Sequence, residues 1–389
     1  MEIQHDGNIF PCGRGQFNTP LGNSKIQTPE DVWNSKGLKE LRLGMLAGKK
    51  SDYCSDCYRI ESCNGVSPRK QHLKSHQSEL ALVDETFEDG SLEVFSLKHL
   101  GLRFSNTCNI KCNYCDHNFS TSWFKDQRAL GIDPKLLVHH QPFETKDGLI
   151  DFITRNLAGL ESVYIAGGEP LLEKAHLDFL DLLIKEDRCD IQITYNTNLT
   201  KITSFGASLC ERWKHFDQIV IDASIDSHGE RNDYIRYGSK FKDLENNLRE
   251  LSKYSNIQTR IYCTVSKFNI LTLGESILYW LENKLIKENC IIFNVLESPR
   301  MYNIQTLSSS QKLQVSENFK ALSKHLFQHY EMGGALQLSA KLKELLTFLG
   351  VADLSHLEEE FVKRCTTLDS LRGCDWVSVF PELNSIALD

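Results

Sequence analysis

The chain has 389 residues, of which 41% are hydrophobic and 25% are charged, the composition of a globular protein with enough apolar side chains for a core. No stretch approaches the roughly 18 consecutive apolar residues of a membrane-spanning helix, and the first residues do not resemble a secretory signal. The net charge of −8 argues against a generic nucleic-acid coat protein, so neither a membrane nor a nucleic-acid partner is expected. The 13 cysteines are too few for a secreted disulfide scaffold, and we expect a cytoplasmic protein whose clustered cysteines bind metal.

Residues 1–75 are rich in Gly, Asn, Ser and Pro and contain one predicted helical stretch. Thr28 is a favourable residue for the N-cap, and Pro29 suits the first turn of the helix that follows. The acidic stretch at residues 77–93 is typical of a linker or a short helix. We therefore predict a small cysteine-rich domain over residues 1–75 and a linker over residues 76–95.

From about residue 94, short β-rich runs alternate with longer helical stretches. The six runs are Leu97–Phe104, Ser162–Ala166, Asp190–Tyr195, Gln218–Ile225, Thr259–Val265 and Cys290–Leu296. The main helical candidates between them are residues 147–158, 173–186, 241–253 and 272–284. This alternation predicts an α/β fold with parallel strands and crossover helices. Six such runs are too few for a closed eight-stranded barrel, which leaves an open partial barrel or a doubly wound sheet.

The end of the chain has a different pattern. Residues 309–362 carry Leu, Phe and Ala at helical spacing. The tail from Asp369 to Asp389 is expected to be irregular. We therefore predict a helical C-terminal region over residues 306–389.

The most specific motif is a set of three cysteines directly after the first β-rich run: Cys108, Cys112 and Cys115, in the spacing C-x3-C-x2-C. Three thiolates on one tight loop can hold three irons of a four-iron cluster. The fourth iron then lacks a protein ligand, as in catalytic metal sites that keep one position open. Zinc is the alternative, although zinc sites usually pair two C-x2-C units.

This loop resembles the signature of the radical S-adenosylmethionine (radical SAM) superfamily, including the aromatic residue Tyr114 before the third cysteine. The resemblance implies a partial (β/α)6 TIM-like barrel over residues 96–305. It also implies that SAM binds the open iron of a [4Fe–4S] cluster. One electron from the cluster then cleaves SAM to a 5′-deoxyadenosyl radical, which abstracts hydrogen from a substrate. An external electron donor such as flavodoxin or ferredoxin is implied as a partner.

The resemblance extends to segments that follow later β-rich runs, where α/β folds place their sites. The residues that it implies as SAM contacts are Tyr114, Gly167, Gly168, Glu169, Pro170, Asn198, Ser224, Asp226, Arg236 and Val265. Among them, Glu169 and its neighbours would bind the amino group of SAM, Arg236 the carboxylate, and Val265 the adenine. Considered singly, the glycines fit an ordinary turn, and Asp226 and Arg236 fit a surface ion pair. Because these residues follow successive β-rich runs in order, a shared SAM site is favoured over these separate explanations.

The N-terminal segment holds a second set of cysteines: Cys12, Cys54, Cys57 and Cys63. Four thiolates can ligate one iron–sulfur cluster or one zinc ion, and spacing alone leaves both open. The surrounding sequence, including Leu21-Gly22-Asn23 and Val32-Trp33-Asn34, resembles the SPASM/twitch auxiliary-cluster domain. The resemblance implies a second, auxiliary [4Fe–4S] cluster and favours the one-cluster twitch form. In most such enzymes this domain follows the barrel, whereas here it precedes it.

The reaction class is better specified than the substrate. The resemblance implies an enzyme that performs radical chemistry on a peptide or protein side chain, with the auxiliary cluster assisting electron transfer or binding substrate. The alternative is the same chemistry on a small metabolite, such as an aminosugar or a nucleotide. The linker is too short for a leader-peptide recognition domain, so no built-in reader of that kind is expected. A non-catalytic zinc-binding protein is the alternative of another class, and no residue is identified as a catalytic acid or base.

Overall fold

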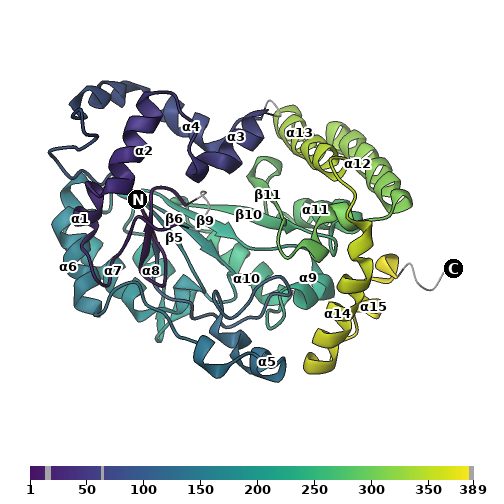
Figure 1. The fold of residues 1–389 in the computed structure, drawn as a ribbon. Helices are drawn as coiled ribbons and strands as arrows, with labels where there is room; N and C mark the ends of the chain where they lie inside the picture. The colour runs from purple at the N-terminus through teal and green to yellow at the C-terminus, as the bar shows by residue number, and fades with distance from the viewer. Residues whose placement is uncertain (14–18, 63–64, 385–389) are drawn as a thin grey trace. The chain divides into compact units, whose positions relative to one another are not determined.

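The structure is a computed structural model that describes residues 1–13, 19–62 and 65–384 (Figure 1). Its internal contacts divide the chain into two compact units. The first unit comprises Met1–Asn106 and His139–Ile193, and the second comprises Thr107–Val138 and Thr194–Asp389. The division therefore falls within the region of alternating strands and helices.

The first unit is built on a sheet that the N-terminal strands share with the first strands of the alternating region. Its strand order is β5-β4-β1-β2-β3. The strands are β1 (Glu2–Ile3), β2 (Asn8–Phe10), β3 (Gly22–Asn23), β4 (His99–Arg103) and β5 (Ser162–Ala166). β1 and β5 each run parallel to β4, whereas β2 is antiparallel to both β1 and β3. The N-terminal segment, predicted as a separate small domain, thus extends this sheet.

The helices of the first unit follow the local sequence signals. α1 (Pro29–Trp33) begins after Thr28, which forms a reciprocal capping box with Asp31, as the Thr-Pro pair predicts. The single helical stretch expected here is two helices, because Ser35 caps a second one, α2 (Lys36–Leu46). The other helices are α3 (Ser55–Ser62), α4 (Pro68–Ser75), the 3₁₀ helix η2 (Gln77–Glu85), α6 (Lys146–Asn156) and α7 (Lys174–Lys185).

The second unit contains three parallel neighbours, β9 (Ile219–Ala223), β10 (Ile257–Val265) and β11 (Ile291–Val295). Every residue of β9 is buried, as expected for a parallel strand with both faces covered. β6 (Gln192–Thr197) spans the boundary in the chain between the two units, and β7 (Thr203–Ser204) and β8 (Ala207–Ser208) form a hairpin. The helices here are α5 (Phe124–Ala129), α8 (Cys210–Trp213), α9 (Gly229–Ile235), α10 (Phe241–Leu251) and α11 (Leu273–Glu282).

The C-terminal region is helical, as predicted. It consists of α12 (Ser309–His329), α13 (Met332–Leu349), α14 (Glu358–Arg372) and α15 (Trp376–Val379). The tail is more regular than expected, because α14 continues to Arg372 and α15 follows it. The ring of Phe268, just after β10, lies 5.2 Å from that of Phe361 in α14 and 5.3 Å from that of Phe380, which follows α15. These aromatic contacts anchor the C-terminal helices within the second unit.

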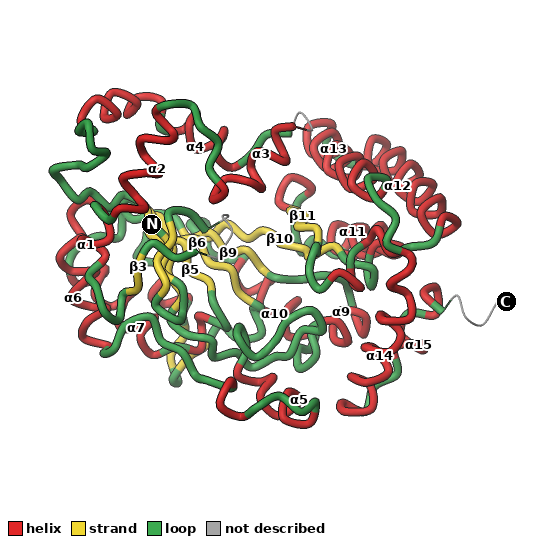
Figure 2. The backbone as a smooth tube through the Cα atoms, viewed as in Figure 1, coloured by secondary structure: helices red, strands yellow, loops and turns green. Residues whose placement is uncertain are grey.

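The α/β fold class predicted from the sequence is confirmed. The strands that correspond to the six β-rich runs are β4, β5, β6, β9, β10 and β11, and the four helical candidates correspond to α6, α7, α10 and α11. Figure 2 shows these strands and helices along the backbone. Within the described ranges, no helix combines the length and the hydropathy needed to cross a membrane.

Candidate functional site

The cysteine loop, residues 108–115, belongs to the second unit and is held by main-chain hydrogen bonds. Lys111 N donates to Tyr237 O at 2.7 Å, and Asn113 N donates to Ile235 O at 2.8 Å. Both acceptors lie at the end of α9 or just beyond it. These two hydrogen bonds attach the backbone of the cysteine loop to the segment that carries Arg236.

The three thiols of the cysteine loop influence one another. Cys112 is buried, and Cys108 and Cys115 are partly buried. Burial raises the pKa of the Cys115 thiol well above its usual value, and Cys112 and Cys108 raise it further. Within the described part of the chain, no three His, Cys, Asp or Glu side chains are grouped closely enough to share one metal ion. Three interacting thiols on one loop fit a cluster in which each thiolate binds a different iron.

Two side-chain N–H groups of the second unit are directed at sulfur atoms of the loop. Asn198 Nδ2 lies 3.7 Å from Cys108 Sγ, and Arg236 Nη1 lies 3.8 Å from Cys112 Sγ. Such donors stabilise a thiolate, and hydrogen bonds to the sulfurs are among the factors that set the reduction potential of an iron–sulfur cluster. These two donors would therefore stabilise Cys108 and Cys112 as thiolate ligands.

A buried network centred on Asp226 lies beside these thiols. Tyr114 Oη donates to Asp226 Oδ2 at 2.6 Å, and Arg236 Nε and Nη2 each lie 2.9 Å from an oxygen of the same carboxylate. Thr264 N donates to Asp226 Oδ1 at 2.8 Å. Burial alone would lower the pKa of Arg236, but the charge of Asp226 and the neighbouring Tyr114 and Cys112 raise it well above its usual value.

This network changes the interpretation of Asp226 and Arg236. The side chain of Asp226 has 0% of its surface exposed and that of Arg236 has 7%, so the alternative of a surface ion pair is wrong. In the structure the two-pronged edge of the Arg236 guanidinium faces Asp226, and the contact of Arg236 with the SAM carboxylate stays a prediction. The remaining nitrogen of the guanidinium, Nη1, faces Cys112.

Three other predicted SAM contacts lie at strand ends of the second unit. Asn198 directly follows β6, Ser224 directly follows β9, and Val265 is the last residue of β10. Ser224 N donates to Thr197 O at 2.8 Å, which joins the ends of two of these strands. Asn198 and Ser224 are almost fully buried, and Val265 has no exposed surface. Their contact with SAM stays a prediction.

The predicted glycine-containing segment lies in the first unit, at the end of β5. Gly167 has a φ of +127°, and a Cβ at this position would lie 2.9 Å from Ser105 O, so glycine is the residue that fits without a shift. Gly168 N donates to the same carbonyl at 3.1 Å. Glu169 is buried, and its Oε1 accepts a backbone N–H at 3.1 Å, which caps the 3₁₀ turn that starts at Pro170. The segment is a fixed turn, and its contact with SAM stays a prediction.

The sequence did not predict that a residue of the C-terminal region, Arg372, supports the cysteine loop. Arg372, the last residue of α14, has 2% of its side chain exposed, and its Nε lies 3.1 Å from Asp126 Oδ2. Its Nη1 donates to Asn113 Oδ1 at 2.5 Å. The guanidinium carbon lies 4.5 Å from the ring centroid of Trp123 and 4.8 Å from that of Tyr237. Asn113 and Arg372 are 259 positions apart in the chain, so no local motif signals this contact.

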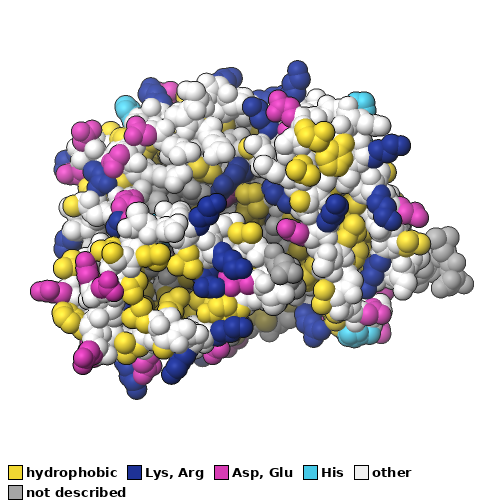
Figure 3. Space-filling model, turned by 90° about the horizontal axis from the view of Figure 1, so that it is seen from above, with side chains coloured by type: hydrophobic (Ala, Val, Ile, Leu, Met, Phe, Trp, Pro, Cys, Tyr) yellow, Lys and Arg dark blue, Asp and Glu magenta, His cyan; other side chains and the backbone are white. Residues whose placement is uncertain are grey.

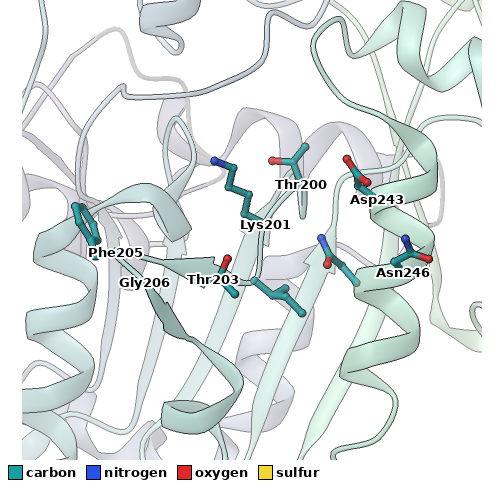
Figure 4. Close-up of a pocket in the computed structure, with 9 residues that line it drawn as sticks. Thr200, Lys201, Thr203, Phe205, Gly206, Asp243 and Asn246 are labelled. Atoms are coloured by element: carbon teal, nitrogen blue, oxygen red, sulfur yellow. The ribbon is translucent and has the colours of Figure 1, made fainter.

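A cavity of about 480 Å³ adjoins the cysteine loop within the second unit (Figure 4). Thr200, Lys201, Asp243 and Asn246 give it a polar lining. Thr200 Oγ1 accepts a hydrogen bond from Asn109 Nδ2 at 2.9 Å, which connects the wall of the cavity to the loop. The space suits a polar ligand.

The N-terminal cysteines lie in the first unit. Cys12 follows β2, Cys54 ends a 3₁₀ turn, and Cys57 lies in the first turn of α3. Burial raises the pKa of the Cys54 thiol, and Cys57 and Cys12 raise it further. Three of the four predicted ligands are thus within electrostatic reach of one another, which fits a thiolate-bound cluster. The fourth, Cys63, lies outside the described residues.

Comparison with known families identifies two domains. The radical SAM superfamily matches residues 102–273, which include the three cysteines of the loop. The SPASM iron–sulfur cluster-binding domain matches residues 1–58, which include Cys12, Cys54 and Cys57. The chain therefore contains a region that matches the radical SAM superfamily and a region that matches the SPASM domain. Its cofactors are accordingly S-adenosylmethionine and iron–sulfur clusters.

Individual relatives are distant. A protein of Methanocaldococcus jannaschii described as uncharacterized is 28% identical over 195 residues, which are 48% of this chain and 59% of that protein. The 7-carboxy-7-deazaguanine synthase of Clostridium acetobutylicum is 28% identical over 121 residues, 31% of this chain and 44% of that enzyme. A solved structure, native anSMEcpe with bound AdoMet, aligns with a TM-score of 0.43 at 19% identity over 59% of this chain and 62% of that one. The chain spans less than two thirds of the length of each of these proteins.

Proposed function

We propose that this radical SAM enzyme abstracts a hydrogen atom from a peptide or protein side chain. Cys108, Cys112 and Cys115 would hold three irons of a [4Fe–4S] cluster and leave the fourth iron to SAM. When bound, the cluster and SAM supply a 5′-deoxyadenosyl radical. The observation that carries the proposal is the cysteine loop itself: its three thiols interact, and Asn198 and Arg236 direct N–H donors at Cys108 and Cys112.

The chain's own residues have three tasks in this proposal. Asp226 orients Arg236 and Tyr114 against the loop, and Arg236 stabilises the charge of the Cys112 thiolate. The burial of these groups excludes water from the inner side of the loop. The residues proposed to bind SAM are Tyr114, Gly167, Gly168, Glu169, Pro170, Asn198, Ser224, Asp226, Arg236 and Val265.

We further propose an auxiliary [4Fe–4S] cluster in the N-terminal segment. Cys12, Cys54 and Cys57 supply three thiolates, and Cys63 is the proposed fourth ligand. The mutual effect of the three described thiols supports this site. Its role would be to assist electron transfer or to bind substrate. A cytoplasmic location, with flavodoxin or ferredoxin as the electron donor, belongs to the same proposal.

A small metabolite is the second candidate substrate. The similarity to a relative named 7-carboxy-7-deazaguanine synthase favours it, and the polar cavity beside the cysteine loop has room for a small polar molecule. The peptide proposal draws on the SPASM domain, because the family resemblance associates auxiliary clusters chiefly with peptide modification. The two candidates share the same radical chemistry and differ in what occupies the site.

Anaerobic purification and cluster reconstitution test the radical chemistry. Two four-iron clusters give about eight irons per chain, and we expect reductive formation of 5′-deoxyadenosine from SAM. The triple variant with Cys108, Cys112 and Cys115 changed to Ala should lose SAM cleavage and about half of the iron. Cys290→Ala, a cysteine outside both sets, is the matched control and should retain both. Stoichiometric zinc without iron, or SAM cleavage by the triple variant, would refute the proposal.

The substrate class is tested separately with the reconstituted enzyme. Formation of 5′-deoxyadenosine is measured with a library of unmodified peptides, with nucleosides and with aminosugars. Substrate-dependent turnover, with deuterium transfer from labelled substrate into 5′-deoxyadenosine, identifies the class. Deuterium transfer from a small metabolite, and from no peptide, would replace the peptide proposal by the second candidate.

A further inference from the structure

The first unit contains an open groove in its N-terminal part, formed by α2, α3, α4 and the 3₁₀ helix η2. Its volume is about 950 Å³. Figure 3 looks onto the side that carries α2 and α4 and shows hydrophobic side chains exposed among lysines and arginines. We call this feature the N-terminal groove.

Two helices of the groove, α2 and α4, each turn one face towards it. α2 contributes Arg42, Met45 and Leu46, which have the i, i+3, i+4 spacing of one helical face. α4 contributes Arg69 and Leu73, which are one turn apart. Regular faces on successive elements make a continuous wall, which a chance gap between side chains would not have.

The wall is apolar but open to solvent. Leu46 is 50% exposed, Leu80 is 48% exposed and Leu82 is 47% exposed, and all three line the groove. Exposed apolar side chains that line one groove and are bordered by polar residues form the kind of surface that binds a partner. A small molecule would remain half in water here, whereas pockets for small ligands usually enclose most of the ligand. An extended partner with its own apolar face fits better.

The charges of the groove are unbalanced. Its two acids are already paired: Glu61 Oε2 with Arg69 Nη2 at 2.5 Å, and Glu79 Oε1 with Lys98 Nζ at 2.7 Å. Among the residues that the structure describes, the lining cations Arg42, Lys49 and Lys50 form no ion pair with an acid, although Arg42 donates to the main-chain oxygens of Trp33 and Gly90. The rim is therefore positive and complements acidic side chains.

We propose that the N-terminal groove binds an amphipathic helical peptide segment whose apolar face is flanked by acidic residues. The leucines of the wall receive the apolar face, as in other helix-in-groove complexes. Lys49, Lys50 and Arg42 meet the acidic flank and set the orientation of the segment. The peptide, and not a lipid or a second copy of the chain, is the occupant that combines both features.

The N-terminal groove lies close to Cys57, one of the proposed ligands of the auxiliary cluster. Tyr58 and Glu61, which line the groove, lie on α3 within one or two turns of Cys57. A bound segment would thus lie next to the proposed auxiliary-cluster site. If the substrate is a peptide, the segment is its recognition part, and this last step rests on the proposed function. The groove would then bind the peptide in place of a separate leader-peptide recognition domain, which the sequence analysis does not expect in this chain.

Fluorescence anisotropy tests the binding without iron, SAM or turnover. The probe is a labelled synthetic amphipathic helix with leucines on one face and glutamates beside them, titrated with the full-length chain. A second probe carries lysine in place of each glutamate. We expect saturable binding of the acidic probe and at least about tenfold weaker binding of the basic one.

Variants locate the binding surface. Leu46→Asp and Leu80→Asp should each weaken the acidic probe by about tenfold or more, because a charge enters the apolar wall. Lys49→Glu with Lys50→Glu should reverse the preference between the probes. Leu313→Asp and Lys36→Glu change exposed residues elsewhere, and they should bind as the unaltered chain does.

Three results would overturn the proposal. They are the absence of saturable binding, equal binding of both probes, and binding that the groove variants leave unchanged. Sedimentation of the unaltered chain and of Leu46→Asp shows whether a second copy fills the groove. A dimer that this variant dissociates would assign the groove to self-association instead. Because the assay needs no cluster, its failure is distinguishable from a failure of the radical chemistry.

Discussion

Replacement of Arg372 by Ala should loosen the cysteine loop although residue 372 lies in the last long helix. The guanidinium holds Asp126 and Asn113 and is packed between the rings of Trp123 and Tyr237. Asn113 lies between the second and third cysteines of the loop. Removal of the side chain therefore takes away a direct support of the cluster ligands.

The size of the effect follows from these contacts. Loss of one partner from a buried ion pair costs about 3–5 kcal/mol. Lys111 Nζ stays 2.7 Å from Asp126 Oδ1, so the carboxylate keeps a cation and the lower end of that range, about 3 kcal/mol, applies. The two ring contacts add about 0.5–1 kcal/mol each. We expect a total loss of about 4 kcal/mol in the free energy of unfolding of the second unit.

Urea denaturation of the anaerobically prepared protein measures this loss. A second assay, the rate at which a chelator removes iron from the reconstituted protein, should show faster release from Arg372→Ala. Lys363→Ala, on an exposed position of the same helix, is the matched control and should change neither quantity. A loss below about 1 kcal/mol, with unchanged iron release, would show that α14 does not support the loop.

Two smaller perturbations test other parts of the site. Gly167→Ala should destabilise the protein by about 2 kcal/mol or more, because alanine is strained at this φ and its Cβ meets a backbone oxygen. The control Gly131→Ala, at φ +84° in open space, should cost about 1 kcal/mol. Equal losses of stability for the two variants in thermal denaturation would contradict the close-contact argument. Asn198→Leu removes the donor to Cys108 Sγ and should lower the midpoint potential of the proposed cluster by about 40 mV, if the hydrogen bond gains about 1 kcal/mol on reduction. Asn109→Ala removes the hydrogen bonds of Asn109 with Asn198 and Thr200 but leaves the donor to Cys108 Sγ in place. It should therefore shift the potential less in an EPR-monitored redox titration.

The elements that the sequence predicted correctly are those with local causes. β9 and β10 are rich in β-branched residues, which favour a strand. Thr28 and Pro29 predicted the start of α1 because capping involves only the next three residues. β1 was not predicted, because its two residues carry no periodicity and its partner, β4, lies almost a hundred positions further along the chain.

The candidate site likewise has features with a local sequence signal and contacts between residues far apart in the chain. The three cysteines of the loop were recognisable because their spacing is itself the signal. The contacts that tune them were not, because Asn198 and Arg236 reach the sulfur atoms from separate strand and helix ends. The contact of Arg236 with SAM is implied by the family resemblance and stays a prediction, whereas only the fold reveals that Asp226 occupies the two-pronged edge of its guanidinium.

The buried pair of Asp226 and Arg236 is better explained by the chemistry of the loop than by stability. A buried ion pair costs desolvation of two charges, and apolar residues of similar volume often stabilise a core at least as well. Here the pair brings a cation to 3.8 Å from Cys112 Sγ while its carboxylate also receives Tyr114 and Thr264. The net charge of the pair is zero, so no unbalanced cation is buried in the absence of the cluster. Its dipole nevertheless has the positive end towards the thiolates, where negative charge accumulates when the proposed cluster is reduced.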